Sequence, residues 1–247
     1  MTGRIFLFVG ILTLSLFPYA AGALRAAGCL AQDRACILKE IETESAQIEN
    51  TSWRDQTYRE LAKTKAADGD MDGAIALIDK IETPDTQAMT IRGIGMAAAD
   101  LKLEKAAYDA LFTKLRTRAE KIEHPPSYAI ALTYIAMAQA FAGDNEGAWK
   151  TASEMENDAL RHKAYGETAE IQAEVGNAHA AMKSIGFIDS IAFRNKAYAI
   201  VSKILADRKD FDGAMAAAMT ITNPYKKAKA LQYILDVQKP REVEKKY

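Results

Sequence analysis

The sequence predicts an all-α fold, an α-solenoid of about five helix–turn–helix repeats plus capping helices. Three observations predict it. Good helix formers such as Ala, Leu, Lys and Glu dominate the 247 residues, whereas only 14 Gly and 6 Pro are present. No segment shows the alternation of apolar and polar residues that is typical of a strand. Short turn segments recur along the chain at a nearly constant spacing, and such regularity decides the architecture.

The first 23 residues have the pattern of a signal peptide. A short basic start precedes an apolar run from Ile5 to Phe17, and small residues follow, so cleavage is predicted after Ala23. The run is shorter than the ~20 residues of a membrane-spanning helix, which makes a retained anchor the weaker alternative. A second alternative is a lipoprotein anchored at Cys29, because the residues before it resemble a lipobox. The chain is therefore expected to be periplasmic or secreted.

Residues 24–51 are predicted to be an N-terminal capping segment, with one or two helices within Ala26–Asn50. Cys29 and Cys36 are the only cysteines, and export favours a disulfide between them. Continuous helix would hold them about 10 Å apart, too far for a bridge, so a disulfide requires a break near Leu30–Asp33. Two thiols without a nearby His do not suggest a metal site.

Residues 52–237 carry the predicted repeats, each marked by an anchor alanine at the start of its second helix. A Gly before the turn supplies a left-handed cap, and the following Asp or Asn accepts backbone N–H bonds. The small anchor allows the two helices to approach to about 8–10 Å between axes. The anchors are Ala74, Ala106, Ala148, Ala181 and Ala214, with spacings of 32, 42, 33 and 33 residues.

The helices of each repeat follow from these turns. First helices are predicted at Ser52–Ala67, Thr86–Ala99, Ser127–Ala142, Asp158–Val175 and Ile191–Ala206. Second helices are predicted at Met71–Ile81, Glu104–Ile122, Asn145–Met155, Ala178–Phe187 and Asp212–Ile221. Prolines at positions 84, 125, 126 and 224 are placed in the connections between repeats, where they do least harm.

A last helix, Tyr225–Val237, is predicted to cap the stack, with three lysines of Lys226–Lys229 on its outer face, and residues 238–247 form a charged tail. A second marker supports the period. The triplet at 163–165, Lys-Ala-Tyr, returns 33 residues later at 196–198, and Lys-Ala-Lys at 227–229 follows after 31 more.

The turn Gly69-Asp70-Met71-Asp72-Gly73-Ala74-Ile75 resembles the inter-helix turn of a tetratricopeptide repeat, as does Gly143-Asp144-Asn145-Glu146-Gly147-Ala148-Trp149. The resemblance spans about Trp53 to Val237. The period of 32–33 is shorter than is usual in that family, the second repeat lacks the Gly-Asp turn, and its second helix is extended. A Sel1-like or other α–α solenoid is the alternative.

The resemblance implies that the first helices line a concave face that binds a peptide or protein. We transfer the concave-face positions of that family to this chain by their spacing from the anchor alanines. The partner-binding residues predicted in this way are Arg59, Lys63, Thr133, Met137, Lys163, Glu170, Lys196 and Lys203. The cationic members suggest an acidic segment or a terminal carboxylate as the ligand.

The sequence offers no pattern of catalysis. The three histidines, His124, His162 and His179, lie in no metal-binding or nucleophile motif. No catalytic residue, metal or cofactor is predicted, and the protein is not expected to be an enzyme. The 33 acidic and 32 basic side chains nearly cancel, so nucleic acid is not an expected partner. The predicted role is an exported protein–protein interaction scaffold or adaptor. The alternatives are a periplasmic helical enzyme acting on envelope polymer and a self-assembling structural protein.

Overall fold

The computed structural model describes residues 29–239, so the predicted signal peptide and all but the first two residues of the predicted tail lie outside the described residues. This part of the chain forms twelve α-helices and no strand, which confirms the all-α prediction. The helices are α1 (Arg34–Ser45), α2 (Thr51–Ala67), α3 (Met71–Ile78), α4 (Pro84–Ala99), α5 (Lys105–Ala119), α6 (Pro125–Phe141), α7 (Asn145–Ser153), α8 (Asp158–Glu174), α9 (Ala178–Gly186), α10 (Ile191–Asp207), α11 (Phe211–Thr220) and α12 (Pro224–Gln238). Within residues 29–239, none of these helices has the length and apolarity needed to cross a bilayer.

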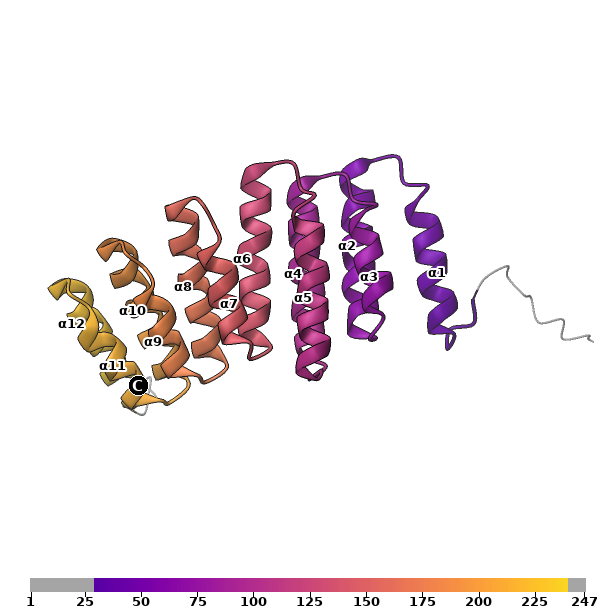
Figure 1. Cartoon of the computed structure of the whole chain (residues 1–247). Helices are drawn as coiled ribbons and strands as arrows, with labels where there is room; N and C mark the ends of the chain where they lie inside the picture. The colour runs from indigo at the N-terminus through magenta and orange to yellow at the C-terminus, as the bar shows by residue number, and fades with distance from the viewer. Residues whose placement is uncertain (1–28, 240–247) are drawn as a thin grey trace, which may run out of the picture.

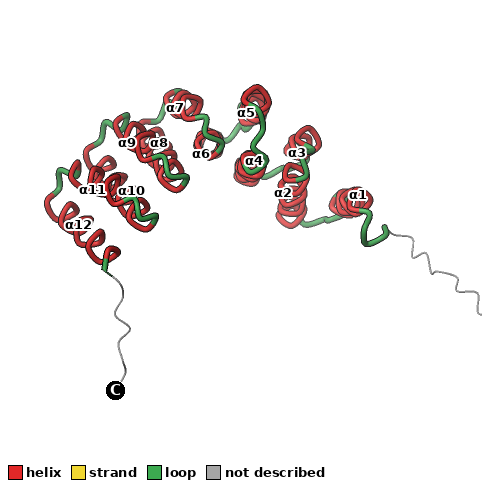
Figure 2. The backbone as a smooth tube through the Cα atoms, turned by 90° about the horizontal axis from the view of Figure 1, so that it is seen from below, coloured by secondary structure: helices red, strands yellow, loops and turns green. Residues whose placement is uncertain are grey.

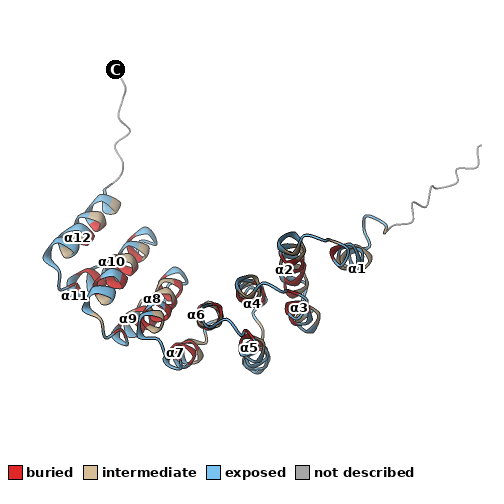
Figure 3. Ribbon diagram, turned by 90° about the horizontal axis from the view of Figure 1, so that it is seen from above, coloured by how far each residue is buried: buried red, intermediate tan, exposed pale blue. Residues whose placement is uncertain are grey.

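The helices lie in two rows along a curve (Figures 1 and 2). Helices α2, α4, α6, α8, α10 and α12 pack successively on one another and form the row on the inner side of the curve. Helices α3, α5, α7, α9 and α11 form the outer row, each packed on the inner helix before it. Buried residues lie mainly where the helices face each other (Figure 3). This arrangement is compatible with the predicted solenoid.

The prolines do not lie in the connections as predicted. Pro84, Pro125 and Pro224 stand in the first turn of α4, α6 and α12. A first-turn N–H has no acceptor within its own helix, so proline loses nothing there, and its fixed φ suits a helix start.

Four of the five predicted turns share one geometry. The residue before the N-cap has a positive φ, between 70° and 88°, at Gly69, Gly143, Gly176 and Lys209. The N-cap side chain then accepts a bond from the backbone N–H three residues later, as Asp70 does from Gly73 at 2.9 Å. The N-cap's own N–H bonds back to the preceding helix, as Asp144 does to the carbonyl of Gln139 at 2.8 Å. These bonds satisfy backbone groups that the helix ends leave open.

The anchor prediction is right at four positions and wrong at the fifth. Ala74, Ala148, Ala181 and Ala214 are 0% exposed, and each is the fourth residue of its helix. Ala106 is exposed.

The fourth residue of α5 is instead Tyr108, which is 7% exposed. Its hydroxyl lies 3.0 Å from the carbonyl oxygen of Ala99 and accepts the N–H of Leu103 at 3.1 Å. The backbones of α4 and α5 approach each other less closely than those of the other four pairs. A tyrosine thus replaces both the small anchor and the backbone bonds of the usual turn.

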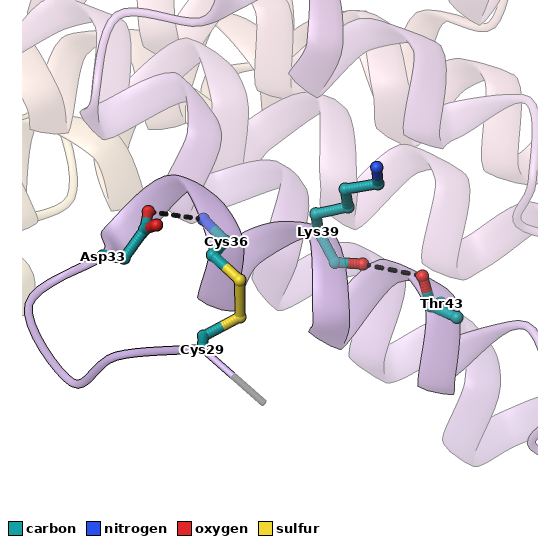
Figure 4. The surroundings of a disulfide bond; sticks show 5 residues. All are labelled: Cys29, Asp33, Cys36, Lys39 and Thr43. Atoms are coloured by element: carbon teal, nitrogen blue, oxygen red, sulfur yellow. Dashed lines mark hydrogen bonds between the residues drawn. A yellow bond between two sulfur atoms is a disulfide. The ribbon is translucent and has the colours of Figure 1, made fainter. Parts of the chain in front are cut away.

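The N-terminal end is held by a disulfide and by ion pairs. Cys29 and Cys36 are bonded, with their Cα atoms 5.4 Å apart, and the chain turns between them (Figure 4). Asp33 caps α1 by accepting the N–H of Cys36 at 2.9 Å. The Nε and Nη2 atoms of Arg34 donate to the two carboxylate oxygens of Asp68 at 2.6 and 2.9 Å, which is a bidentate ion pair. Because Ser45 is the only buried residue of α1, charged contacts hold this helix more than apolar packing does.

Candidate functional site

Two adjoining hollows lie on the inner row at its C-terminal end. A cavity of about 160 Å³ lies between α8 and α10, and a groove of about 660 Å³ lies between α10 and α12. Lys196 and Ile200 of α10 line both, so we treat the two hollows as one inner groove. The groove is large enough to bury several side chains of a partner.

Four of the eight predicted partner-binding residues meet in the inner groove. Lys163, Glu170 and Lys196 line the cavity between α8 and α10. Lys196 and Lys203 line the larger hollow between α10 and α12. The three lysines are exposed, so their ammonium groups are accessible to a partner.

The other four predicted residues lie elsewhere. Arg59 and Lys63 are on α2, where the guanidinium of Arg59 pairs with Glu60 at 2.8 Å. Thr133 and Met137 on α6 are 5% and 9% exposed, so they are interior residues with little surface to offer a partner. The Thr133 hydroxyl donates to the carbonyl of Ala129 at 3.0 Å, and Met137 packs in one cluster with Ile171. Their burial does not support the predicted role of Thr133 and Met137 in partner binding.

Helix α12 contributes groove residues that the sequence analysis missed. Lys226, Lys229 and Tyr233 line the hollow between α10 and α12. The sequence predicts that the lysines of α12 lie on the outer face of a cap, but Lys227 is half-buried, and Lys226 and Lys229 line the groove.

A signal for Lys229 was present in the sequence. Lys163, Lys196 and Lys229 are each the sixth residue of their helix and are 33 residues apart. The third triplet is thus 229–231, two residues later than predicted.

The charges of the inner groove are only partly balanced by the chain itself. Lys163 lies 3.6 Å from Glu167. Among the described residues, Lys196, Lys203, Lys226 and Lys229 form no ion pair with a carboxylate. The ammonium of Lys203 lies 5.1 Å from the ring centre of Tyr233, a cation–π contact. Positive charge therefore accumulates around α10 and α12.

Glu170 is the carboxylate most affected by this environment. Burial raises its pKa, and the neighbouring charges of Glu167 and Glu174 raise it further, whereas Lys196 opposes the change. Ionised Glu170 is thus less stable in the folded chain than in the unfolded chain.

Replacing Glu170 by glutamine is expected to stabilise the fold near neutral pH, on the order of a few tenths of a kcal/mol because solvent screens the site. Because the pKa of Glu170 is raised in the folded chain, ionisation of Glu170 lowers the free energy of unfolding. Below the ordinary carboxyl pKa, Glu170 is protonated in both the folded and the unfolded chain, so this loss is absent. It grows as the pH rises through the raised pKa. Urea unfolding at pH 4 and pH 7 measures this difference. A gain that is as large at pH 4 as at pH 7 would rule out ionisation as its cause.

His162 lines the cavity between α8 and α10, and its position has a structural explanation. It is the fifth residue of α8, as Asn195 is of α10 and Asp55 is of α2. Asn195 accepts the N–H of Thr222 at 2.8 Å, and Asp55 accepts that of Thr83 at 2.8 Å. Asn195 and Asp55 thus tie their helices to the next connection. The Nε2 atom of His162 lies 3.8 Å from the Asp189 carboxylate in the corresponding connection.

A third hollow lies on the outer row, beside α5, α7 and α9, with a volume of about 930 Å³. Its lining carries Lys105, Arg116, Lys150 and Lys183 against three carboxylates, so neither sign of charge prevails. Residues 29–239 contain no group of three or more His, Cys, Asp or Glu side chains arranged to hold a metal.

The fold and the groove define an all-α protein with a cationic surface on its inner row. No known protein family, curated protein or solved structure matches the chain.

Proposed function

We propose that the chain is an exported interaction scaffold or adaptor that binds a peptide or protein on the inner row of its helices. The inner groove is the observation that supports this proposal best. It combines apolar lining from Ala199, Ile200 and Ala230 with exposed lysines that have no carboxylate partner among the described residues. Such a surface suits a partner that brings both apolar contacts and negative charge.

The resemblance to tetratricopeptide repeats supports the same role, since it implies binding by the first helices. Those helices correspond to the inner row. The Cys29–Cys36 disulfide accords with an exported protein, because disulfides persist in oxidising compartments.

Site-specific photo-crosslinking in the native host tests the proposal. A crosslinking residue at position 199, inside the groove, is expected to capture a distinct partner protein. The same residue at position 106, an exposed alanine of α5 on the outer row, serves as the matched control and is expected not to capture it. Equal capture from both positions, or none from position 199, would refute a specific role of the inner row.

Self-assembly is the second candidate, and the same experiment separates it. The C-terminal end of the stack exposes Tyr225 and Leu235 of α12, at 69% and 53%. Leu235 is the twelfth residue of α12, and the twelfth residue of α10 is Ser202, which α11 covers so that it is 1% exposed. A second copy of the chain could cover Leu235 in the same way. If position 199 captures only a second copy of the chain, the protein is a self-assembling structural protein.

A further inference from the structure

We propose that the partner of the inner groove is an acidic, extended segment that crosses α8, α10 and α12 and carries a carboxylate at every third residue. This inference rests on the proposed function and specifies the chemistry of the partner. It follows from two features of the groove, its unbalanced charge and the spacing of its lysines.

The charge selects the sign of the partner. Lys196 and Lys203 of α10 face Lys226 and Lys229 of α12 across one hollow. Within residues 29–239, the only carboxylate lining that hollow is Asp207, which accepts a bond from the hydroxyl of Tyr233 at 2.5 Å, whereas Glu167 and Glu170 line the smaller hollow between α8 and α10. Several basic residues nearer the N-terminus are paired within the chain, for example Arg54 with Glu82 at 2.6 Å and Lys80 with Glu42 at 2.7 Å. An anionic partner would supply the carboxylates that the C-terminal end lacks.

The spacing selects the conformation of the partner. Lys163, Lys196 and Lys229 hold the same position on three successive helices of the inner row. Packed helices lie about 8–10 Å apart, so equivalent lysines on successive helices can present their ammonium groups as a ladder with steps of that order. A polyproline II segment rises ~3.1 Å per residue and turns once in three residues, which places every third side chain on one face at steps of ~9 Å. A β-strand would direct side chains three apart to opposite faces.

The apolar surface between the lysines of the groove indicates which residues of the partner lie between its carboxylates. Ile200 and Tyr233 lie one helical turn beyond Lys196 and Lys229 and line the same hollow. Small apolar or proline residues of the partner can cover this surface without adding charge. The ligand is therefore a segment in which acidic residues alternate with pairs of apolar ones.

Fluorescence anisotropy with two labelled synthetic peptides and the chain without its predicted signal peptide tests the inference. One peptide repeats Glu-Pro-Leu, and the other has the same composition with its glutamates contiguous. The spaced peptide is expected to bind about tenfold more tightly than the clustered one, and its affinity should fall as salt rises. Equal affinities of the two peptides would overturn the inference that the spacing of the lysines selects the spacing of the partner's carboxylates.

Charge reversal locates the site. Lys196→Glu combined with Lys229→Glu is expected to weaken binding of the spaced peptide by at least about tenfold. Lys121→Glu, at an exposed position just after α5 of the outer row, is the matched control and is expected to leave the affinity unchanged. Lys196→Gln with Lys229→Gln gives a milder second variant, expected to weaken binding less, should the reversed variant lose helicity by circular dichroism. If neither double variant weakens binding, the inference fails. Crosslinking of a partner from position 199 would then still support the scaffold, with a partner of different chemistry.

Discussion

Replacing Ala181 by leucine is expected to lower the free energy of unfolding by about 1–3 kcal/mol. Ala181 is 0% exposed and is the fourth residue of α9, where that helix packs on α8. The larger side chain must either separate the two helices or leave its preferred rotamer, because the interior has no space for it. Urea unfolding followed by far-ultraviolet circular dichroism measures the effect.

Ala106→Leu is the matched control, because the same substitution falls on an exposed position of α5. Its effect is expected to stay within about 0.5 kcal/mol. The sequence alone places Ala106 among the buried anchors, whereas the structure places Tyr108 there. A loss at Ala106 as large as that at Ala181 would contradict the structural register of α5.

The helices themselves could be predicted because their ends are encoded locally. The bounds predicted for α2 to α12 differ from the observed ones by at most three residues. Asp70, Asp144, Asn177 and Asp210 each cap the helix that follows them, and this chemistry is visible in a short window of sequence.

The register of α5 could not be predicted in the same way. Its left-handed residue is Lys102, with a φ of 50°, and the N-cap Glu104 follows after one additional residue. The side chain of Glu104 makes no capping bond. The bonds of this turn come instead from Tyr108, which lies further along the chain, so no local pattern marks it.

The inner groove could be predicted only in part, because spacing gives a position along a helix but not how closely the neighbouring helices cover it. Met137, Glu170 and Lys203 are each the thirteenth residue of their helix. Met137 is buried because α6 packs closely on both α4 and α8, whereas Lys203 is exposed beside the hollow between α10 and α12. Such differences in helix separation come from tertiary packing and are invisible in the spacing alone.

Replacing Gln139 by leucine is expected to cost about 1–3 kcal/mol, because it leaves a buried hydroxyl without its acceptor. Gln139 of α6 accepts the hydroxyl proton of Thr151 of α7 at 2.8 Å, and the two residues are 7% and 4% exposed. Thr151→Ala is expected to cost a similar amount, because the amide oxygen of Gln139 then loses its donor. Gln172 and Ser184 make the corresponding bond between α8 and α9 at 2.5 Å.

The double variant, with Gln139→Leu and Thr151→Ala, is expected to be more stable than either single variant. At the corresponding positions of α10 and α11 the chain itself has Leu205 and Ala217, both 0% exposed. The double variant therefore reproduces a pair that the same architecture already contains, with an apolar contact and no unpaired polar group. A double-mutant cycle from urea unfolding should give a coupling energy of about 1–2 kcal/mol. Additive losses would instead mean that the glutamine and the threonine act independently, and that the helix pairs are less equivalent than their shared positions indicate.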